Sequence, residues 1–179
     1  MIYKTNYPSA VGNLLLVAED ESLVGLWIVG QKYFLGTLKE EPVENENLPV
    51  FHQTKQWLDD YFAGKRPDIA FLSLKPKGSD FRQIIWDILC QIPYGQVATY
   101  GDIAKEAAKR LNKKTMSAQA VGNAIGHNPI SIIIPCHRVV GTNGSLTGYA
   151  GGIDKKIKLL ELEGIDTKAY FVPKTGTAL

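Results

Sequence analysis

The spacing of the apolar residues changes once along this chain, and that change limits the possible folds more than any other feature of the sequence. Up to residue 74 the apolar residues form short runs separated by turn-forming residues, which is typical of strands. After residue 80 they recur every three or four residues, which is typical of helices. Between these stretches lies the polar segment KPKGSD, residues 75–80. A chain of 179 residues suffices for one large domain or two small ones, and we predict an α+β protein with domains over residues 1–76 and 80–179.

The first domain is predicted to begin with a meander of antiparallel strands. Its three strands cover residues 2–7, 13–20 and 23–29, with turn residues between them. The acidic residues 40–49, which include two prolines, are expected to form an exposed loop. A helix follows over residues 51–64, where aromatic residues recur at helical spacing and Gly64 is suited to cap the end. A short strand is predicted for residues 69–74.

The second domain is predicted to be mainly helical. An apolar stripe runs from Phe81 to Ile92, and Asp80 is suited to cap the N-terminus of this helix. Further helices are expected over residues 101–111, 117–126 and 154–163, the last two beginning at Ser117 and Asp154. A tight turn joins the first two of these, as in a helix-turn-helix.

The helix predicted over residues 117–126 carries very little side chain. Positions 118, 120, 122, 124 and 126 are all alanine or glycine. Small residues allow a helix to pack closely against a neighbouring helix, and they also allow it to approach an external surface such as a DNA groove. From the residues alone both interpretations stand, and close packing is the more common one.

The charge of the chain is unevenly distributed. Residues 80–160 contain ten lysine and arginine residues against five aspartate and glutamate residues, while residues 1–79 contain eight against ten. A basic half suits a polyanion such as DNA, although proteins without that partner often show a similar imbalance. The sequence shows no signal-peptide pattern and no apolar run of membrane-spanning length. We therefore expect a cytoplasmic protein with reduced thiols and no membrane partner.

The chain has two cysteines, which are too few for a framework of disulfides. Cys90 lies within an apolar helical stripe and is interpreted as a buried residue. Cys136 follows Pro135 and precedes His137 and Arg138, so basic and proton-accepting groups stand beside it. Thiolate is the nucleophilic form of cysteine, and it is produced by a nearby base, which works better when a carboxylate orients it.

No metal site and no cofactor are predicted. His52 lies in a predicted surface helix and His127 in a predicted loop, and neither is assigned a role. The cysteines and histidines do not form any spacing, such as CxxC or HExxH, that is typical of metal ligands.

Residues 134–152, IPCHRVVGTNGSLTGYAGG, resemble the active-site signature of the O6-alkylguanine-DNA alkyltransferases, also called methylated-DNA–protein-cysteine methyltransferases. The resemblance continues, in the family's order, through DDYFAGKR at 59–66, IPYGQVATYGDIA at 92–104, AVGNAIGHNPI at 120–130 and KLLELEG at 158–164. It covers nearly the whole chain and is firmest from residue 80 to residue 164. The presence of several separate motifs in one order makes it specific.

The resemblance implies a fold, a reaction and a partner. The first domain would be an RNase H-like α/β domain with a small antiparallel sheet, and the second a winged-helix-like domain that contains the helix-turn-helix. The protein would bind double-stranded DNA as a monomer, without a cofactor, and move an alkyl group from O6-alkylguanine to Cys136. The resulting thioether is stable, so each molecule would act once. Whether O4-methylthymine is also repaired stays open.

The resemblance also assigns catalytic roles to five residues. Cys136 would attack the alkyl carbon of a guanine that is flipped out of the duplex. His137 would take the proton of Cys136 through a water molecule, and Glu163 would orient His137. Tyr100 would donate a hydrogen bond to the departing guanine. Asn128 would brace the turn between the DNA-reading helix and the cysteine.

Further positions are implied for DNA binding and for the substrate pocket. The DNA-binding residues would be Tyr100, Gly101, Ser117, Gln119, Ala120 and Thr142. The pocket would be lined by Val139, Tyr149, Ala150 and Gly151. Gln119 stands where the family usually has an arginine that enters the duplex, and Ala150 stands where many members have a serine. Gln119 can still form hydrogen bonds, but it lacks the charge and the flat shape of a guanidinium group.

Two other classes of function remain as alternatives. A non-catalytic relative would only recognise alkylated bases; such relatives lack the cysteine, which this chain has, and only Gln119 favours this alternative. A cysteine hydrolase would use Cys136 and His137 for repeated turnover of a small ester or peptide. The small-residue helix and the basic second half do not support a hydrolase.

Overall fold

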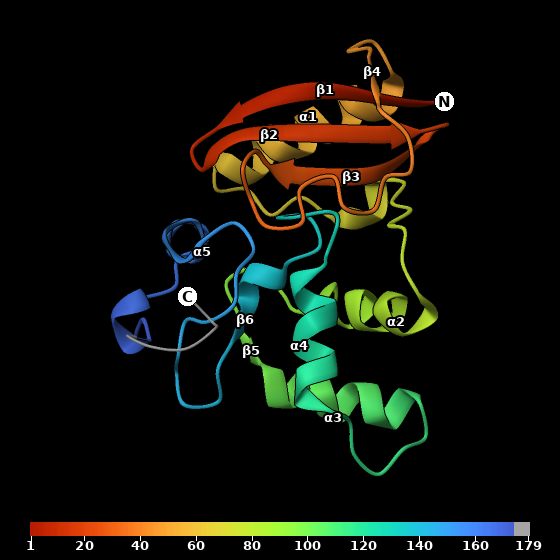
Figure 1. The fold of residues 1–179 in the computed structure, drawn as a ribbon. Coiled ribbons are helices and arrows are strands. Elements are labelled where there is room, and N and C mark those ends of the chain that lie inside the picture. The colour runs from red at the N-terminus through yellow and green to blue at the C-terminus, as the bar shows by residue number, and fades with distance from the viewer. Residues whose placement is uncertain (174–179) are drawn as a thin grey trace. The chain divides into compact units, whose positions relative to one another are not determined.

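The computed structural model describes residues 1–173 and divides the chain into two compact units, each of which we describe by itself. The first unit contains residues 1–77 and 129–133, and the second contains residues 78–128 and the chain from residue 134 onward (Figure 1). Residues 174–179, the last six of the predicted second domain, lie outside the described residues. No helix within residues 1–173 is both long and apolar enough to cross a membrane.

A four-stranded sheet forms the body of the first unit. β1 (Ile2–Ser9), β2 (Gly12–Glu19) and β3 (Ser22–Ile28) pair antiparallel in chain order, which confirms the predicted meander. β4 (Val43–Glu44) pairs parallel with β1, so the strand order is β3-β2-β1-β4. The sheet is therefore mixed: its three long strands are antiparallel, as expected, and β4 adds a short parallel strand within residues 40–49, where only a loop was expected. The sequence gives no sign of β4 because both of its residues are exposed and have no apolar alternation.

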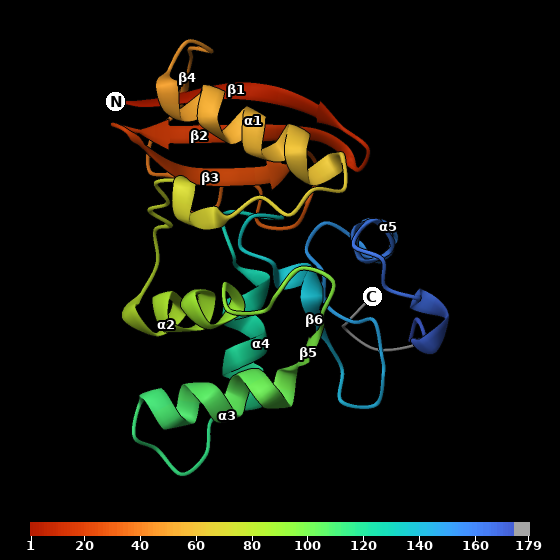
Figure 2. The ribbon, with the colours of Figure 1, turned by 180° about the vertical axis from the view of Figure 1, so that it is seen from behind.

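Helix α1 (Pro49–Phe62) lies across one face of this sheet (Figure 2). Its buried side consists of Val50, Phe51, Thr54, Trp57, Leu58 and Tyr61. The predicted cap at Gly64 is confirmed, because its φ of 82° places the backbone in the left-handed region that favours glycine. The N–H groups of Gly64 and Lys65 donate to the carbonyls of Tyr61 and Asp60, which is the pattern of a Schellman motif.

The strand predicted for residues 69–74 is mostly absent. Residues Ile69–Phe71 form a 3-10 turn, η1, and only Leu74 makes a β-bridge, with Leu23. The side chain of Asp68 accepts the N–H of Ala70 at 2.9 Å and caps this turn. The local hydrogen bond from the backbone to Asp68 competes with the extended conformation that the apolar run predicted.

The second unit is largely helical, as predicted. Its helices within residues 78–173 are α2 (Asp80–Leu89), α3 (Tyr100–Arg110), α4 (Ala118–Gly126) and α5 (Ile153–Leu162). Two very short strands, β5 (Ala98–Thr99) and β6 (Val139–Val140), pair parallel. Two 3-10 turns accompany them, η2 (Cys136–Arg138) and η3 (Thr167–Ala169).

The N-termini of α2 and α5 differ from the predicted caps. Ser79, not Asp80, caps α2, because the Oγ of Ser79 accepts a backbone N–H of the first turn at 3.3 Å. Gly152, not Asp154, is the residue before α5, where its φ of 99° directs the chain into the helix. The predicted cap of α4 is confirmed, since the side chain of Ser117 accepts a backbone N–H of that helix.

Helices α2, α3 and α4 pack together, and a buried tryptophan joins α2 to α4. The indole Nε1 of Trp86 in α2 donates to the carbonyl of Ala124 in α4 at 2.9 Å, and Trp86 is 1% exposed. Trp86 lies beside the predicted apolar stripe, which is wider than expected because two helices cover α2. The buried side of α4 consists of Val121, Ala124 and Ile125, so this packing turns its other side outward.

Candidate active site

Cys136 is the first residue of η2 and is only 7% exposed. Asn128, which follows α4, donates from Nδ2 to the carbonyl of Ile134 at 2.8 Å. The backbone N–H of Cys136 donates to the same carbonyl, also at 2.8 Å. The side chain of Asn128 therefore fixes the backbone immediately before the cysteine, at the position where a brace was expected.

His137, Arg138 and Glu163 form a buried cluster in the same unit. The Nε2 of His137 lies 2.6 Å from Oε2 of Glu163, and both side chains are 0% exposed. Arg138 donates to the two carboxylate oxygens of Glu163 from Nε at 2.8 Å and from Nη2 at 3.1 Å. The backbone N–H of Gly95 adds a further hydrogen bond, to Oε1 at 3.0 Å. Glu163 thus holds both of the basic side chains that follow Cys136.

The charge state of Glu163 determines which nitrogen of His137 carries the proton. Burial alone would raise the pKa of Glu163, but the hydrogen bonds and charges of His137 and Arg138 outweigh it and lower the pKa to about 2. The carboxylate is therefore ionised and only accepts, so the Nε2 of His137 must be the donor. Burial lowers the pKa of His137 as its largest influence, which favours the neutral ring. Neutral His137 then has an acceptor at Nδ1, which is buried and has no hydrogen-bond partner among residues 1–173.

The end of α5 positions Glu163. This residue is the C-cap, and Gly164 after it has a φ of 84°. The N–H groups of Gly164 and Ile165 donate to the carbonyls of Glu161 and Leu160, which is the pattern of a Schellman motif. The chain reverses here, and the side chain of the C-cap residue points to the cluster instead of to solvent. The sequence KLLELEG therefore encodes a carboxylate at a helix end.

Without a base to accept its proton, the thiol of Cys136 stays protonated. Burial raises its pKa, while a hydrogen bond with Asn128 and the positive charge of Lys156 act in the opposite direction. Burial also raises the pKa of Cys90, to about 11. Because neither thiol ionises readily by itself, a reaction of Cys136 as a nucleophile requires a base.

Lys156 is a buried lysine that the sequence analysis did not single out. It is 0% exposed, and its Nζ donates to the carbonyl of Thr147 at 2.8 Å and to that of Val139. Burial lowers its pKa to about 8. Its position on the buried side of α5, three residues before Leu159, was the signal in the sequence. Lys156 ties α5 to β6 and to the segment that leads to the predicted pocket.

Among the predicted pocket residues, Tyr149 lies beside His137, and the neighbouring Gly148 lies beside Tyr100. The hydroxyl of Tyr100 donates to the carbonyl of Thr147 at 3.1 Å. A Cβ on Gly148, where φ is 73°, would lie 2.8 Å from that hydroxyl, so the backbone must pass Tyr100 without a side chain. The ring of Tyr149 stands edge-on to the ring of His137, with centroids 6.4 Å apart, and Tyr149 is largely buried. Gly148 was missed because a glycine that faces another side chain looks in the sequence like any turn glycine.

The other predicted pocket residues lie in β6 and in the turn before α5. Val139 is buried in β6, and Ala150 and Gly151 are half-buried in the turn before α5. Gly101 and Thr142 lie next to one another, since a Cβ on Gly101 would be 3.6 Å from Oγ1 of Thr142. The structure therefore brings together two residues that are 41 positions apart and were both expected to contact DNA.

The predicted DNA-reading residues of α4 are on its exposed side. Ser117, Gln119 and Ala120 are all exposed. A Cβ added to Gly122 or Gly126 would meet no atom within 4 Å. Close packing against another element of residues 1–173 therefore does not explain these two glycines. They leave a smooth surface on one side of the helix that presents Gln119.

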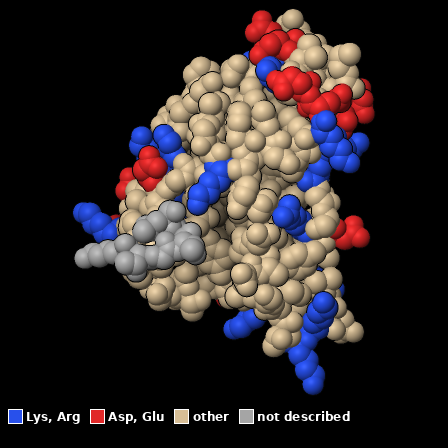
Figure 3. Space-filling model, viewed as in Figure 1, with Lys and Arg blue, Asp and Glu red and all other residues tan. Residues whose placement is uncertain are grey.

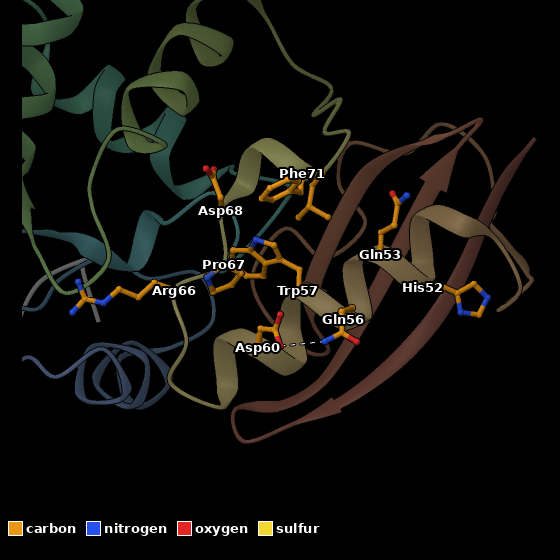
Figure 4. Close-up of a pocket in the computed structure, with 10 residues that line it drawn as sticks. His52, Gln53, Gln56, Trp57, Asp60, Arg66, Pro67, Asp68 and Phe71 are labelled. Atoms are coloured by element: carbon orange, nitrogen blue, oxygen red, sulfur yellow. Dashed lines mark hydrogen bonds between the residues drawn. The ribbon is translucent and has the colours of Figure 1, made fainter.

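Residues 1–173 contain no group of three or more His, Cys, Asp or Glu side chains that is arranged to hold a metal ion. A hollow of about 810 Å³ lies in the first unit beside Trp57, Arg66, Pro67 and Phe71 (Figure 4). Its lining contains none of the predicted catalytic or DNA-binding residues and no cysteine. All of the predicted catalytic residues lie instead in the second unit.

The sequence and the fold resemble those of proteins with known activities. The family profile for the ribonuclease-like domain of 6-O-methylguanine DNA methyltransferase matches residues 2–76, and the profile for the DNA binding domain of that family matches residues 80–165. A methylated-DNA--protein-cysteine methyltransferase of Haemophilus influenzae is 40% identical over 164 residues, which are 92% of this chain and 87% of that protein. The protein of the same name from Methanosarcina acetivorans is 41% identical over 164 residues, which are 91% of this chain and 99% of that protein.

Solved structures of similar proteins agree with this result. A Mycobacterium tuberculosis O6-methylguanine methyltransferase has a TM-score of 0.76 and 38% identity, and the match covers 91% of this chain and 93% of that one. A structure of Mycobacterium tuberculosis OGT in complex with DNA has a TM-score of 0.73 and 36% identity, and the match covers 94% of each chain.

Proposed function

Since this chain belongs to the 6-O-methylguanine DNA methyltransferase family, we infer that it repairs DNA by direct reversal of alkylation. It transfers an alkyl group from O6 of guanine in DNA to one of its own cysteines, which we propose is Cys136. The observation that supports this assignment best is the order of groups around His137. A buried thiol directly precedes a neutral imidazole whose Nε2 is held by an ionised carboxylate and whose Nδ1 is an acceptor.

In the proposed reaction, the proton of the Cys136 thiol moves through a water molecule to Nδ1 of His137, and Glu163 stabilises the imidazolium that forms. The Sγ of Cys136 then attacks the alkyl carbon and forms an S–C bond as the C–O bond to guanine breaks. The guanine leaves with the electron pair of that bond and takes up a proton, for which Tyr100 provides a hydrogen-bond donor. Nothing in this scheme breaks the thioether, so each molecule acts once.

The buried position of Cys136 requires that the damaged base come to it. At 7% exposed, this thiol is out of reach of a guanine that remains stacked in a duplex. We propose that the base flips into the pocket formed by Tyr100, Tyr149 and the backbone at Gly148. The hydroxyl of Tyr100 donates to the carbonyl of Thr147 without substrate, and it would exchange this partner for the guanine.

We propose that α4 enters the minor groove. No described residue of another element comes within 4 Å of a Cβ added to Gly122 or Gly126, which supports this placement, because a smooth helix surface can approach a groove closely. Gln119 is the long side chain at its N-terminal end and would occupy the space that the flipped base leaves. Gly101 and Thr142, which lie together, would contact the adjacent backbone.

The experiment that tests the proposed function is a mass measurement. The protein is incubated with an excess of duplex DNA that contains O6-methylguanine, beside the variants Cys136→Ser and Cys90→Ser. We expect the mass of the protein and of Cys90→Ser to increase once, by about 14 Da, and that of Cys136→Ser to stay constant. A methyl group on Cys90, an unmodified protein, or several guanines repaired per molecule would each contradict the proposal.

We also propose that the protein acts in the cytoplasm. Both cysteines are free thiols in the structure, and a reducing compartment keeps the nucleophile in that form. Fractionation of the source cells with detection of the protein would test this location.

A further inference from the structure

The proposed approach of α4 to DNA leaves the attraction to the phosphates unexplained. The exposed residues of this helix are Ala118, Gln119, Ala120 and Asn123, none of which is charged. Proteins that bind duplex DNA obtain much of their affinity from lysine and arginine side chains that neutralise phosphates. The positive charge that this chain brings to the duplex must therefore come from elements beside α4.

Four lysines lie together immediately before α4. Lys105 and Lys109 are one turn apart on α3, and Lys113 and Lys114 belong to the turn that joins α3 to α4. With Ala104, Ala108, Thr115 and Met116 they line a hollow of about 480 Å³. We call Lys105, Lys109, Lys113 and Lys114 the lysine face.

The end of α3 brings the two pairs of lysines together. Asn112 has a φ of 53°, in the left-handed region, and the N–H of Lys113 donates to the carbonyl of Ala108 at 2.8 Å. This closed end turns the chain back beside the last turn of α3 instead of letting it run on. The lysine face is therefore built by the backbone and does not depend on the chance positions of long side chains.

The lysine face has one acidic neighbour, since the charge of Lys105 contributes, after the hydrogen bonds with Thr99, to a lowered pKa of Asp102. All four lysines are exposed, and no hydrogen bond or ion pair of their ammonium groups is found within the described residues. The two acidic residues of α3 have other partners. The carboxylate of Asp102 accepts the backbone N–H of Thr99, and the N–H of Asp102 donates to Oγ1 of Thr99, which completes the capping box. Glu106 pairs with Arg110.

The surface around the turn between α3 and α4 is mainly basic. In Figure 3 the charged side chains visible over the turn between α3 and α4 are lysine or arginine. The lining of the hollow contains no aspartate and no glutamate. Like charges one helical turn apart repel each other, so this arrangement becomes favourable when a polyanion covers it.

We propose that the lysine face binds the phosphodiester backbone of undamaged duplex beside the lesion. Met116, which lines the hollow, directly precedes Ser117, the cap of α4, so the lysine face adjoins the N-terminal end of the helix that faces the groove in the proposed function, on which this inference rests. A phosphate strand that passes α4 meets the lysine face next. Because Gln119 adds no charge, these four lysines supply a large part of the salt dependence of DNA binding.

The test compares three double variants that each lose two positive charges. Lys105→Gln/Lys109→Gln and Lys113→Gln/Lys114→Gln remove halves of the lysine face. Lys158→Gln/Lys168→Gln is the control, because these lysines are exposed in the same unit but lie on α5 and η3. Binding to an unmodified duplex is measured at several salt concentrations for the full chain and each variant, and melting temperatures verify that all of them are folded.

For each half of the lysine face we expect the slope of log K against log salt to decrease by about 1 to 2, since one phosphate contact contributes about 0.9. The control pair should keep the slope of the unaltered chain. The proposal would be overturned if all three variants kept the slope of the unaltered chain, because the lysine face would then not contact phosphates. It would also be overturned if the slope decreased equally in all three, because the lysines would then act only through net charge. The mass measurement on the unaltered chain decides the proposed function separately, whatever the slopes are.

Discussion

Glu163 is the residue on which two buried basic side chains depend. In Glu163→Gln the side chain keeps its shape but loses its charge and one acceptor. We expect alkyl transfer to slow by more than about tenfold, since His137 loses the group that stabilises its protonated form. We also expect the free energy of unfolding to decrease by roughly 3–5 kcal/mol, because Arg138 stays buried without its counter-charge. Single-turnover kinetics and urea unfolding measure the two effects.

Glu161→Gln is the matched control for this variant. Glu161 is exposed on the same turn of α5 and accepts a hydrogen bond from Thr167, so its replacement should change neither quantity by much. A less stable Glu163→Gln protein that transfers alkyl groups at the normal rate would restrict Glu163 to a structural role.

The buried amine of Lys156 should make stability increase with pH in the alkaline range. Its pKa is about 8 in the folded chain and 10.5 for an ordinary lysine. Between these values the unfolded chain holds a proton that the folded chain has released, so raising the pH favours folding. The neutral amine keeps two N–H groups for the carbonyls of Val139 and Thr147. The protein should gain up to roughly 3 kcal/mol relative to Lys156→Met from pH 8 to pH 10.5.

Urea unfolding of both proteins at several pH values measures this difference, with Lys158→Met on the exposed side of α5 as the control. A constant difference between the protein and Lys156→Met across this range would show that the folded chain keeps Lys156 charged.

The candidate site was predictable from the sequence where its residues belong to the motifs of the family. Cys136, His137 and Glu163 were assigned in this way, and the structure places Nε2 of His137 2.6 Å from the carboxylate of Glu163. Lys156 and Gly148 were not singled out. The partners of Lys156 are backbone carbonyls, and Gly148 is required by its distance to the hydroxyl of Tyr100. A sequence shows residue types but not which backbone atoms approach them.

At the scale of elements, the proposed placement of α4 predicts that one substitution can weaken DNA binding without lowering stability. At position 122 an added Cβ meets no atom of another element within 4 Å among the described residues, and leucine is a better helix former than glycine, so we expect Gly122→Leu to fold. The free energy of unfolding should therefore stay constant or increase by up to about 1 kcal/mol. Affinity for duplex DNA should decrease by more than about tenfold, because the side chain would separate the helix from the groove floor.

Thermal unfolding and binding isotherms measure these opposite effects, and transfer from the free base O6-methylguanine shows whether the pocket is intact. If Gly122→Leu binds DNA as tightly as the unaltered chain, α4 does not lie in the groove.

Helices and strands were predictable where the apolar periodicity extends over many residues. They were missed where a few local hydrogen bonds determine the backbone conformation. The helices and the meander follow from their periodicity. The predicted strand over residues 69–74 was wrong because one side chain, Asp68, caps a tight turn there. The cap of α2 differs from the prediction by one residue, since Ser79 and Asp80 are both good caps and only the backbone decides between them.

At the scale of the whole molecule, the first unit takes five residues from the middle of the second. The N–H of Leu26 donates to the carbonyl of Pro129, and the N–H of Ser131 donates to the carbonyl of Leu26, both at 2.8 Å. Ile130, Ile132 and Ile133 are at most 2% exposed. A sequence-based boundary at residues 75–80 does not reveal this segment, because its apolar run precedes Cys136 and reads as part of the second domain.

The fragment 78–179 should therefore aggregate or melt at a lower temperature than the full chain, because the three isoleucines become exposed. Replacing residues 129–133 of the fragment by glycine and serine should restore its solubility, since Asn128 still binds the carbonyl of Ile134. Light scattering and thermal melting of both fragments test this. Equal solubility of the two fragments would mean that this segment does not need the first unit.

The path of the chain also restricts how such a gene can be rearranged. The polypeptide changes unit between residues 77 and 78, 128 and 129, and 133 and 134. A recombination event at residue 77 that brings in a different N-terminal half would leave residues 129–133 matched to a sheet that is no longer there. The two halves of the gene are therefore expected to be inherited together, and chimaeras between distant relatives should function only when this short segment is exchanged with the N-terminal half.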